Sequence, residues 1–172
     1  MGTRFKILYT NELLKELQKY KYKSIHIHHT WKPDHSDYNG ENGIRLQENM
    51  FRHHTQVNGW ADIGQHLTLL PDGKWVTGRA FNKTPASITG HNTGALAIEM
   101  LGNFDIGNDV LEGEQLNAII ELCAYFVRNG LPYEKIIFHR EYSNKTCPGT
   151  GIDKTEFIEM IKNRVEMGKE GE

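Results

Sequence analysis

Apolar residues recur at the spacing of an amphipathic helix in four segments of the chain: residues 10–20, 45–57, 114–129 and 153–165. Two of these segments end close to Gly59 and Gly130, and glycine is the residue type expected just past a helix end. Asp153 and Glu156 are spaced like a capping box at the start of the last segment. The pattern therefore predicts four helices.

Five other segments have the short period or the continuous apolar character of β-strands: residues 24–30, 65–70, 75–78, 95–101 and 135–139. The second and third flank the turn sequence 71–74, and its Asp72-Gly73 pair is a strong signal for a hairpin. The fourth is almost entirely apolar, as in a central strand buried on both faces, and Glu99 is its exception. Strands and helices alternate, which indicates an α/β fold.

The first predicted strand carries three histidines. Ile25 and Ile27 alternate with His26 and His28, so those two histidines share one face of the strand. His29 then points to the other face. This strand can therefore direct imidazoles into a cleft.

The length of 172 residues favours a single domain, 1–172, which can bury roughly 70% of its unfolded surface without disulfides. The charged, glycine-bearing segment 168–172 is typical of a tail or linker remnant. With 20 basic and 22 acidic residues, the net charge of −2 gives no electrostatic reason to bind a phosphate backbone. Nucleic acid is not an expected partner.

The chain lacks two kinds of apolar segment. No run approaches the roughly 20 apolar residues of a membrane span, so no membrane insertion is expected. The first residues lack the apolar region of a secretory signal peptide. We therefore expect a protein made in the cytoplasm, which would reach a substrate outside the membrane only after release, as when a phage lyses its host.

The two cysteines lie in different contexts. Cys123 falls within the apolar pattern of segment 114–129, where a small buried residue fits a helix face. Cys147 lies in a polar loop close to Lys145 and His139, without an expected disulfide partner. A metal ligand explains Cys147 better than an ordinary loop cysteine does.

Segment 139–149 places an imidazole, an ammonium and a thiol close together. Zn²⁺ takes nitrogen and sulfur ligands, and catalytic zinc sites use three protein ligands with a fourth position for water. His139 and Cys147 would supply two ligands. The third would come from the strand at 24–30, where spacing alone does not choose among His26, His28 and His29. For any single histidine, a hydrogen-bonded structural role is the default.

Two further residues could carry out chemistry beside such a metal. Burying a carboxylate without a partner costs free energy, so the presence of Glu99 in an apolar strand requires an explanation. Beside water held at the metal it could take up a proton and pass it to a leaving amine, and the alternative is a structural salt bridge. Lys145 could stabilise the oxyanion formed from an amide carbonyl, although a solvated lysine is the usual state of that residue type.

The combined motifs resemble the type 2 N-acetylmuramoyl-L-alanine amidases, a zinc family that includes phage lysozyme-type amidases and animal peptidoglycan-recognition proteins. The resemblance spans residues 24–162. It is carried by His28-His29-Thr30 after an apolar strand, by segments 59–66 and 92–99, and by His139 with Lys145 and Cys147. It implies a mixed sheet of five or six strands flanked by helices, with one zinc ion at the floor of an open groove.

The resemblance also assigns roles to residues. His28, His139 and Cys147 match the family's zinc ligands, and Lys145 matches its catalytic lysine. Three further residues match positions along the substrate groove, where they could serve in packing or in substrate contact: Trp60, His66 and Asn92.

One position departs from the pattern of many family members. They carry a tyrosine that helps to position the zinc water, and this chain has Gln65 there. Gln65 cannot act as an acid or base. Bacterial and phage branches instead place a glutamate at the position of Glu99, which the resemblance therefore implies is the proton-transfer residue.

The resemblance implies a function as well. We expect hydrolysis of the amide bond between N-acetylmuramic acid and L-alanine in bacterial peptidoglycan, by a monomeric catalytic domain of a phage or prophage endolysin or of an autolysin. A cytoplasmic amidase that recycles muropeptides and a non-catalytic peptidoglycan-binding module are the alternatives. Cys147 argues against the binding module, because several family relatives that merely recognise peptidoglycan have lost this ligand.

Overall fold

The computed structural model describes residues 2–169, within which six strands form one mixed sheet. The strands are β1 (Ile7–Leu8), β2 (Ser24–His29), β3 (Leu67–Leu69), β4 (Trp75–Thr77), β5 (Ala95–Met100) and β6 (Ile136–Phe138). Their order is β1-β4-β3-β5-β2-β6. β5 is parallel to β3 and β2, and β2 is parallel to β6, whereas β4 is antiparallel to β1 and β3. The expected α/β fold with a mixed sheet is confirmed.

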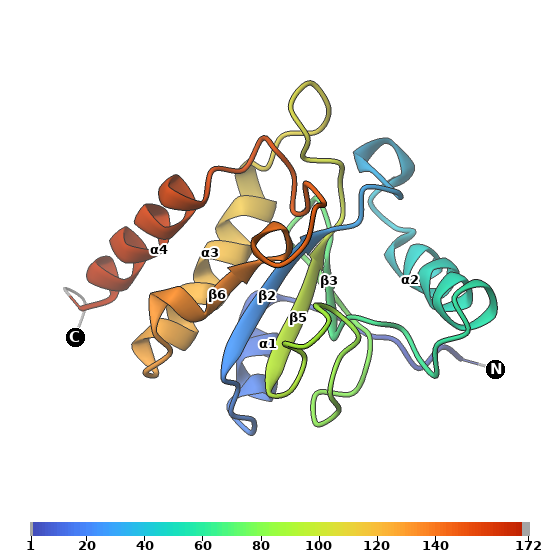
Figure 1. The fold of residues 1–172 in the computed structure, drawn as a ribbon, viewed down its shortest axis with the longest axis horizontal. Coiled ribbons are helices and arrows are strands. Elements are labelled where there is room, and N and C mark those ends of the chain that lie inside the picture. The colour runs from blue at the N-terminus through green and yellow to red at the C-terminus, as the bar shows by residue number, and fades with distance from the viewer. Residues whose placement is uncertain (1, 170–172) are drawn as a thin grey trace.

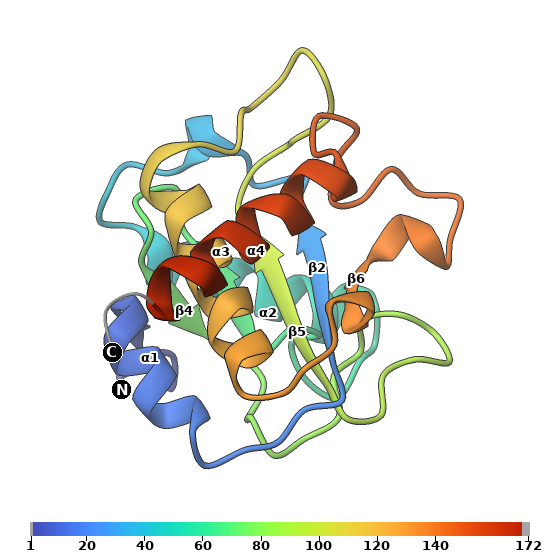
Figure 2. The ribbon, with the colours of Figure 1, turned by 90° about the vertical axis from the view of Figure 1, so that its left-hand side faces the viewer.

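Four α-helices cover the two faces of this sheet: α1 (Thr10–Leu17), α2 (Gly43–Arg52), α3 (Gly113–Arg128) and α4 (Lys154–Lys169). α1, α3 and α4 lie on one face and α2 lies on the other (Figure 1). Figure 2 shows α4 and α3 layered in front of the strands. Within residues 2–169, no helix combines the length and apolar character needed to cross a membrane.

The apolar core is divided by the sheet into two unequal parts. The larger part lies under α1, α3 and α4 and receives Ile25 and Ile27 from β2. The smaller part lies under α2, around Leu46 and Met50. Since side chains alternate along a strand, His26 and His28 face the side of α2. A one-residue slip of β2 would move both isoleucines out of the larger core, at roughly 1.5–3 kcal/mol each. Burial thus fixes which histidines face α2.

The predicted helices and the hairpin are confirmed, with shifted ends. α2 begins at Gly43 and continues as one π-helical turn, His53–Val57, before Gly59 takes a φ of 70°. α4 continues through residues 168 and 169, which the sequence analysis had assigned to the tail; residues 170–172 lie outside the described residues. β1 was not predicted, because two residues are too few to show a period.

Candidate metal centre

β2 and β5 place a histidine and a carboxylate side by side. His28 pairs in register with Glu99, and Glu99 pairs with Thr68 of β3 on its other side. Residues in one register row point to the same face of a sheet, so all three side chains face the α2 side. The metal candidate and the proton-transfer candidate therefore lie on adjacent strands.

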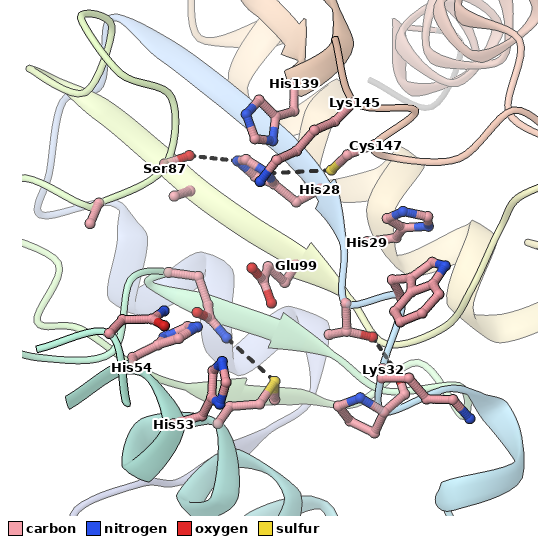
Figure 3. A pocket seen from close by; sticks show the side chains of 18 of the residues that line it. His28, His29, Lys32, His53, His54, Ser87, Glu99, His139, Lys145 and Cys147 are labelled. Carbon is pink, nitrogen blue, oxygen red and sulfur yellow. Dashed lines mark hydrogen bonds between the residues drawn. The ribbon is translucent and has the colours of Figure 1, made fainter. Parts of the chain in front are cut away.

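Three candidate metal ligands meet above this row (Figure 3). The ligand atoms of His28, His139 and Cys147 all lie within 4.8 Å of one another. Cys147 Sγ is 3.4 Å from Nδ1 of His28, and the rings of His28 and His139 have centroids 4.7 Å apart. Neighbouring ligand atoms in a tetrahedral zinc site lie roughly 3.3–3.8 Å apart, given the Zn–N and Zn–S bond lengths. This donor set therefore fits zinc after small side-chain movements.

Of the three histidines that spacing left open, His28 is the one that joins this cluster. His29 points to the opposite face, where its Nδ1 accepts a hydrogen bond of 3.1 Å from the backbone N–H of Phe104. His26 lies on the same face as His28, and its ring contacts two serines instead. Geometry thus selects the same histidine that the family resemblance selected.

The loop after β6 is folded so that Cys147 returns to His139. The backbone N–H of Arg140 donates to the carbonyl of Cys147 at 2.8 Å. The Arg140 guanidinium also donates to the carbonyls of Gly149, at 2.8 Å, and Ile152, at 2.6 Å. Charge-assisted bonds of this kind are among the stronger ones in proteins, so they hold the loop in place.

The surroundings of the three candidate ligands favour the neutral form of each in the metal-free protein. Burial, followed by the nearby His139, holds the pKa of His28 well below its usual range. Burial and Lys145 lower the pKa of His139. Burial raises the pKa of Cys147 to about 12, so its thiol keeps its proton. A bound cation would have to displace that proton, which is usual for zinc sites.

Glu99 is a partly buried carboxyl facing the same cavity (Figure 3). Burial raises the pKa of Glu99 to about 7, and the positive charge of Lys145 acts in the opposite direction. None of the ion pairs within residues 2–169 involves Glu99, so a structural salt bridge does not account for it. A carboxyl group with a pKa near 7 can both accept and release a proton at neutral pH.

The cluster opens into a cavity of about 910 Å³. In Figure 3 the three ligands and Lys145 lie on one side of Glu99, and His53 and His54 lie on the other. Lys145 is exposed at the cavity wall, and its side chain extends toward His28 (Figure 3). The opposite wall comes from α2 and its π-helical turn, a feature that is frequent at functional sites.

The three predicted groove residues are in different environments. Trp60 lines the cavity and is 40% exposed, with its ring against His54. His66 is fully buried, where its Nε2 bonds to the Lys83 carbonyl and its Nδ1 accepts from the N–H of Ala97. His66 therefore serves in packing.

Asn92 holds a loop near the site. Its Oδ1 accepts hydrogen bonds from the N–H groups of Ser87, at 3.0 Å, and Ile88, at 2.8 Å. Ser87 lines the cavity, whereas Asn92 is not among its lining residues. Asn92 thus fixes the backbone of the loop that carries Ser87.

Gln65 lies at the cavity wall where many family members have tyrosine. Its Nε2 donates to Thr68 Oγ1 at 3.1 Å, and its Oε1 has no hydrogen-bond partner among the described residues. Gln65 is 2% exposed. Its amide is held by Thr68, which pairs with Glu99 across β3 and β5. It has no group that can transfer a proton.

Ser87 and Trp31 are among the cavity residues that the sequence analysis missed. Ser87 gives no local signal, because its partners lie about sixty positions away. Trp31 is 57% exposed and has a φ of 60°, a left-handed conformation that costs roughly 1–2 kcal/mol for a residue with a side chain. The sequence shows only a tryptophan shortly after the histidine strand, and its exposure and its backbone conformation became visible only in the structure.

Comparison with known protein families gives a match over most of the chain. A family model described as N-acetylmuramoyl-L-alanine amidase matches residues 18–150. Peptidoglycan-recognition protein SC2 of Drosophila melanogaster is 32% identical over 111 residues, which cover 63% of this chain and 59% of that protein. The chain thus spans about three fifths of the length of this relative.

Two solved structures share the fold. A variant of Drosophila PGRP-LB in complex with tracheal cytotoxin has a TM-score of 0.67 at 27% identity, covering 77% of this chain and 78% of that chain. The endolysin of a Thermus scotoductus bacteriophage has a TM-score of 0.62 at 25% identity, covering 81% of this chain and 84% of that chain. The similarity is thus spread over most of the domain.

Proposed function

The chain belongs to the N-acetylmuramoyl-L-alanine amidase family, and we propose that it hydrolyses the amide bond between N-acetylmuramic acid and L-alanine in peptidoglycan. One observation carries this proposal. His28, His139 and Cys147 converge within 4.8 Å, and Glu99 and Lys145 line the cavity into which this cluster opens. The residues that we propose as ligands, proton carrier and fixed positive charge thus lie at one site.

The two nitrogen donors and one sulfur donor suit a single zinc ion. When bound, such an ion would polarise the scissile carbonyl and make water a stronger nucleophile near neutral pH. The protein supplies the geometry: His28 is fixed by β2, His139 by the end of β6 and Cys147 by the Arg140 loop. The burial of His28 and Cys147 keeps bulk water from two of the three donors.

Glu99 and Lys145 would carry the remaining chemistry. Glu99 takes a proton from the attacking water as the water oxygen bonds to the lactyl carbonyl carbon. Lys145 stabilises the negative charge that develops on the carbonyl oxygen. Glu99 then gives the proton to the L-alanine nitrogen as the C–N bond breaks. The products are a lactyl carboxylate on the glycan and a stem peptide with a free amino terminus.

Action on the cell wall is the biological setting that we propose, as a phage or prophage endolysin or an autolysin domain. The likeness to a bacteriophage endolysin supports this setting. Bound tracheal cytotoxin in the PGRP-LB variant supports a peptidoglycan-type ligand for the cavity. A purely binding function has less support, because three candidate metal ligands and Glu99 lie at the same cavity.

Mass spectrometry of digested cell wall tests the reaction. The proposal expects new L-alanine amino termini without new reducing ends, and it expects their loss when a zinc chelator is added. New reducing ends instead would identify a glycosidase and defeat the proposal. Binding to the wall with no new termini at any zinc concentration would favour the binding module.

A second comparison separates the lytic role from the recycling role. Purified protein is given intact cell walls or soluble muropeptides at matched concentrations of the amide bond. A lytic enzyme is expected to cleave intact walls at a rate comparable to that for soluble fragments. Cleavage of soluble muropeptides alone would support the recycling amidase.

A further inference from the structure

Ser87 joins two histidines of β2 through one hydroxyl. Its Oγ lies 2.6 Å from Nε2 of His28 and 2.9 Å from Nδ1 of His26. The other nitrogen of His26, Nε2, lies 3.4 Å from Oγ of Ser24, and Nδ1 of His28 faces Cys147 at 3.4 Å. A continuous series of polar side chains therefore runs from Ser24 to the cluster of candidate metal ligands. His26 is fully buried within this series.

The backbone of Ser87 is held from two directions. Asn92 Oδ1 accepts the N–H groups of residues 87 and 88, and the N–H of Ala86 donates to the Gly64 carbonyl at 3.1 Å. A side chain at Gly64 would lie 2.6 Å from the Ala86 carbonyl oxygen, so the two segments are in close contact. The position of the hydroxyl is thus set by the fold.

The number of protons on these side chains limits the directions in which their hydrogen bonds can run. A hydroxyl has one proton to donate, and a neutral imidazole has one N–H. If Ser87 donates to His28, the proton of His28 sits on Nδ1 and blocks the nitrogen that faces Cys147. If Ser87 donates to His26, Nε2 of His28 donates to Ser87 and Nδ1 is free to bind a metal.

We propose that Ser87 is a positioning residue for the metal, which selects the metal-binding tautomer of His28 by donating its own proton to His26. This inference rests on the proposed function, because it assumes a metal at the cluster. His26 is the acceptor that turns the hydroxyl proton away from His28, and Ser24 accepts the remaining N–H of His26. Hydrogen bonds from metal-binding histidines to outer groups commonly set the tautomer and ring orientation.

Zinc affinity tests this role without any assay of turnover. Metal-stripped wild-type protein and Ser87→Ala are titrated with zinc against a chromogenic chelator. Ser87→Ala is expected to bind zinc about 10- to 100-fold more weakly, the usual effect of losing such an outer partner. Ser87→Thr, which keeps the hydroxyl, is expected to recover most of the affinity.

The matched control is Thr89→Ala, which removes an exposed hydroxyl from the same loop. It is expected to leave zinc affinity unchanged. Equal affinity of Ser87→Ala and wild type would overturn the inference while leaving the proposed function intact. Wild-type protein that binds no zinc would instead count against the proposed function itself.

The wild-type protein alone gives a second readout. Long-range ¹H–¹⁵N correlation spectra of the zinc-loaded protein report which ring nitrogen carries each proton. We expect the N–H of both His26 and His28 on Nε2. A His26 proton on Nδ1, pointing at Ser87, would contradict the proposed direction of these hydrogen bonds. This result would hold even if a variant failed to fold.

Discussion

Glu99 combines two properties at the residue scale: it interrupts an apolar strand, and it faces a cavity that holds three potential metal ligands. Its environment raises its pKa to about 7, which suits a group that must accept and then release a proton. The sequence already marked Glu99 as anomalous, because a carboxylate in a central strand needs compensation.

Replacing Glu99 by Gln removes proton transfer and keeps the shape of the side chain. We expect kcat to fall by roughly 10²- to 10⁴-fold, the usual contribution of a positioned acid–base group. Zinc content, measured by atomic emission, is expected to stay at the wild-type level. Near-normal turnover in Glu99→Gln would remove Glu99 from the mechanism.

The raised pKa of Glu99 also makes stability depend on pH. The folded protein keeps this proton up to about pH 7, whereas an unfolded glutamate loses it near the usual value of 4.5. Between these values the folded state binds more protons, so its stability falls as the pH rises. The shift corresponds to on the order of 3 kcal/mol.

Chemical denaturation of metal-free protein measures this effect. We expect Glu99→Gln to gain stability relative to wild type as the pH rises from 4.5 to about 7, with a constant difference outside this window. Taking the difference between the two proteins removes the contributions of the histidines. A difference that does not change with pH would mean that Glu99 ionises normally in the fold.

Lys145 is exposed, so its replacement should affect the reaction and spare the fold. We expect Lys145→Met to lower kcat by roughly 10²- to 10³-fold, as when one oxyanion contact is lost. Lys135→Met is the control, at another exposed lysine, which ends the short 3-10 helix Tyr133–Lys135 directly before β6. An equal effect of both substitutions would argue against a specific role for Lys145.

The sequence revealed site residues only where local context was informative. His139, Lys145 and Cys147 lie within nine residues of one another, so their shared chemistry was readable. The contacts of Ser87 with His26 and His28 span about sixty residues and arise from loop placement. The packing role of His66 likewise depends on Ala97 and Lys83, which no periodicity relates to it.

At the scale of elements, the register of β2 and β5 creates the site. Apolar alternation places Ile25 and Ile27 in the larger core and so sends His28 toward α2. The parallel pairing of β2 with β5, and the pairing of β5 with β3, could not be predicted from the sequence pattern alone, because periodicity identifies strands without ordering them. The resemblance to a family supplied the mixed sheet in advance.

The contact between the Ser87 loop and segment 59–66 gives an element-scale prediction. A methyl group at Gly64 would lie 2.6 Å from the Ala86 carbonyl and 2.9 Å from Cζ3 of Trp60. We expect Gly64→Ala to destabilise the protein by roughly 1–3 kcal/mol through this overlap. Urea denaturation measures it, with Gly2→Ala as a control in open space. Unchanged stability would show that the two segments can separate freely.

At the scale of the whole molecule, the sheet divides a closed side from an open one. α1, α3 and α4 cover the larger core, and α2 covers only part of the opposite face (Figure 1). The uncovered part is the cavity of about 910 Å³ with the ligand cluster on its wall. Composition and hydrophobic pattern indicated the fold class, but the size and walls of this cavity depend on how β2, β5, α2 and the loop after β6 lie in space.

X-ray absorption at the zinc edge, on protein loaded with one equivalent of zinc, tests the central claim most directly. The account predicts one sulfur at about 2.3 Å and nitrogen or oxygen donors at about 2.0–2.1 Å, with the sulfur lost in Cys147→Ser. Zinc bound with nitrogen and oxygen donors alone in the wild-type protein would contradict a centre built from His28, His139 and Cys147.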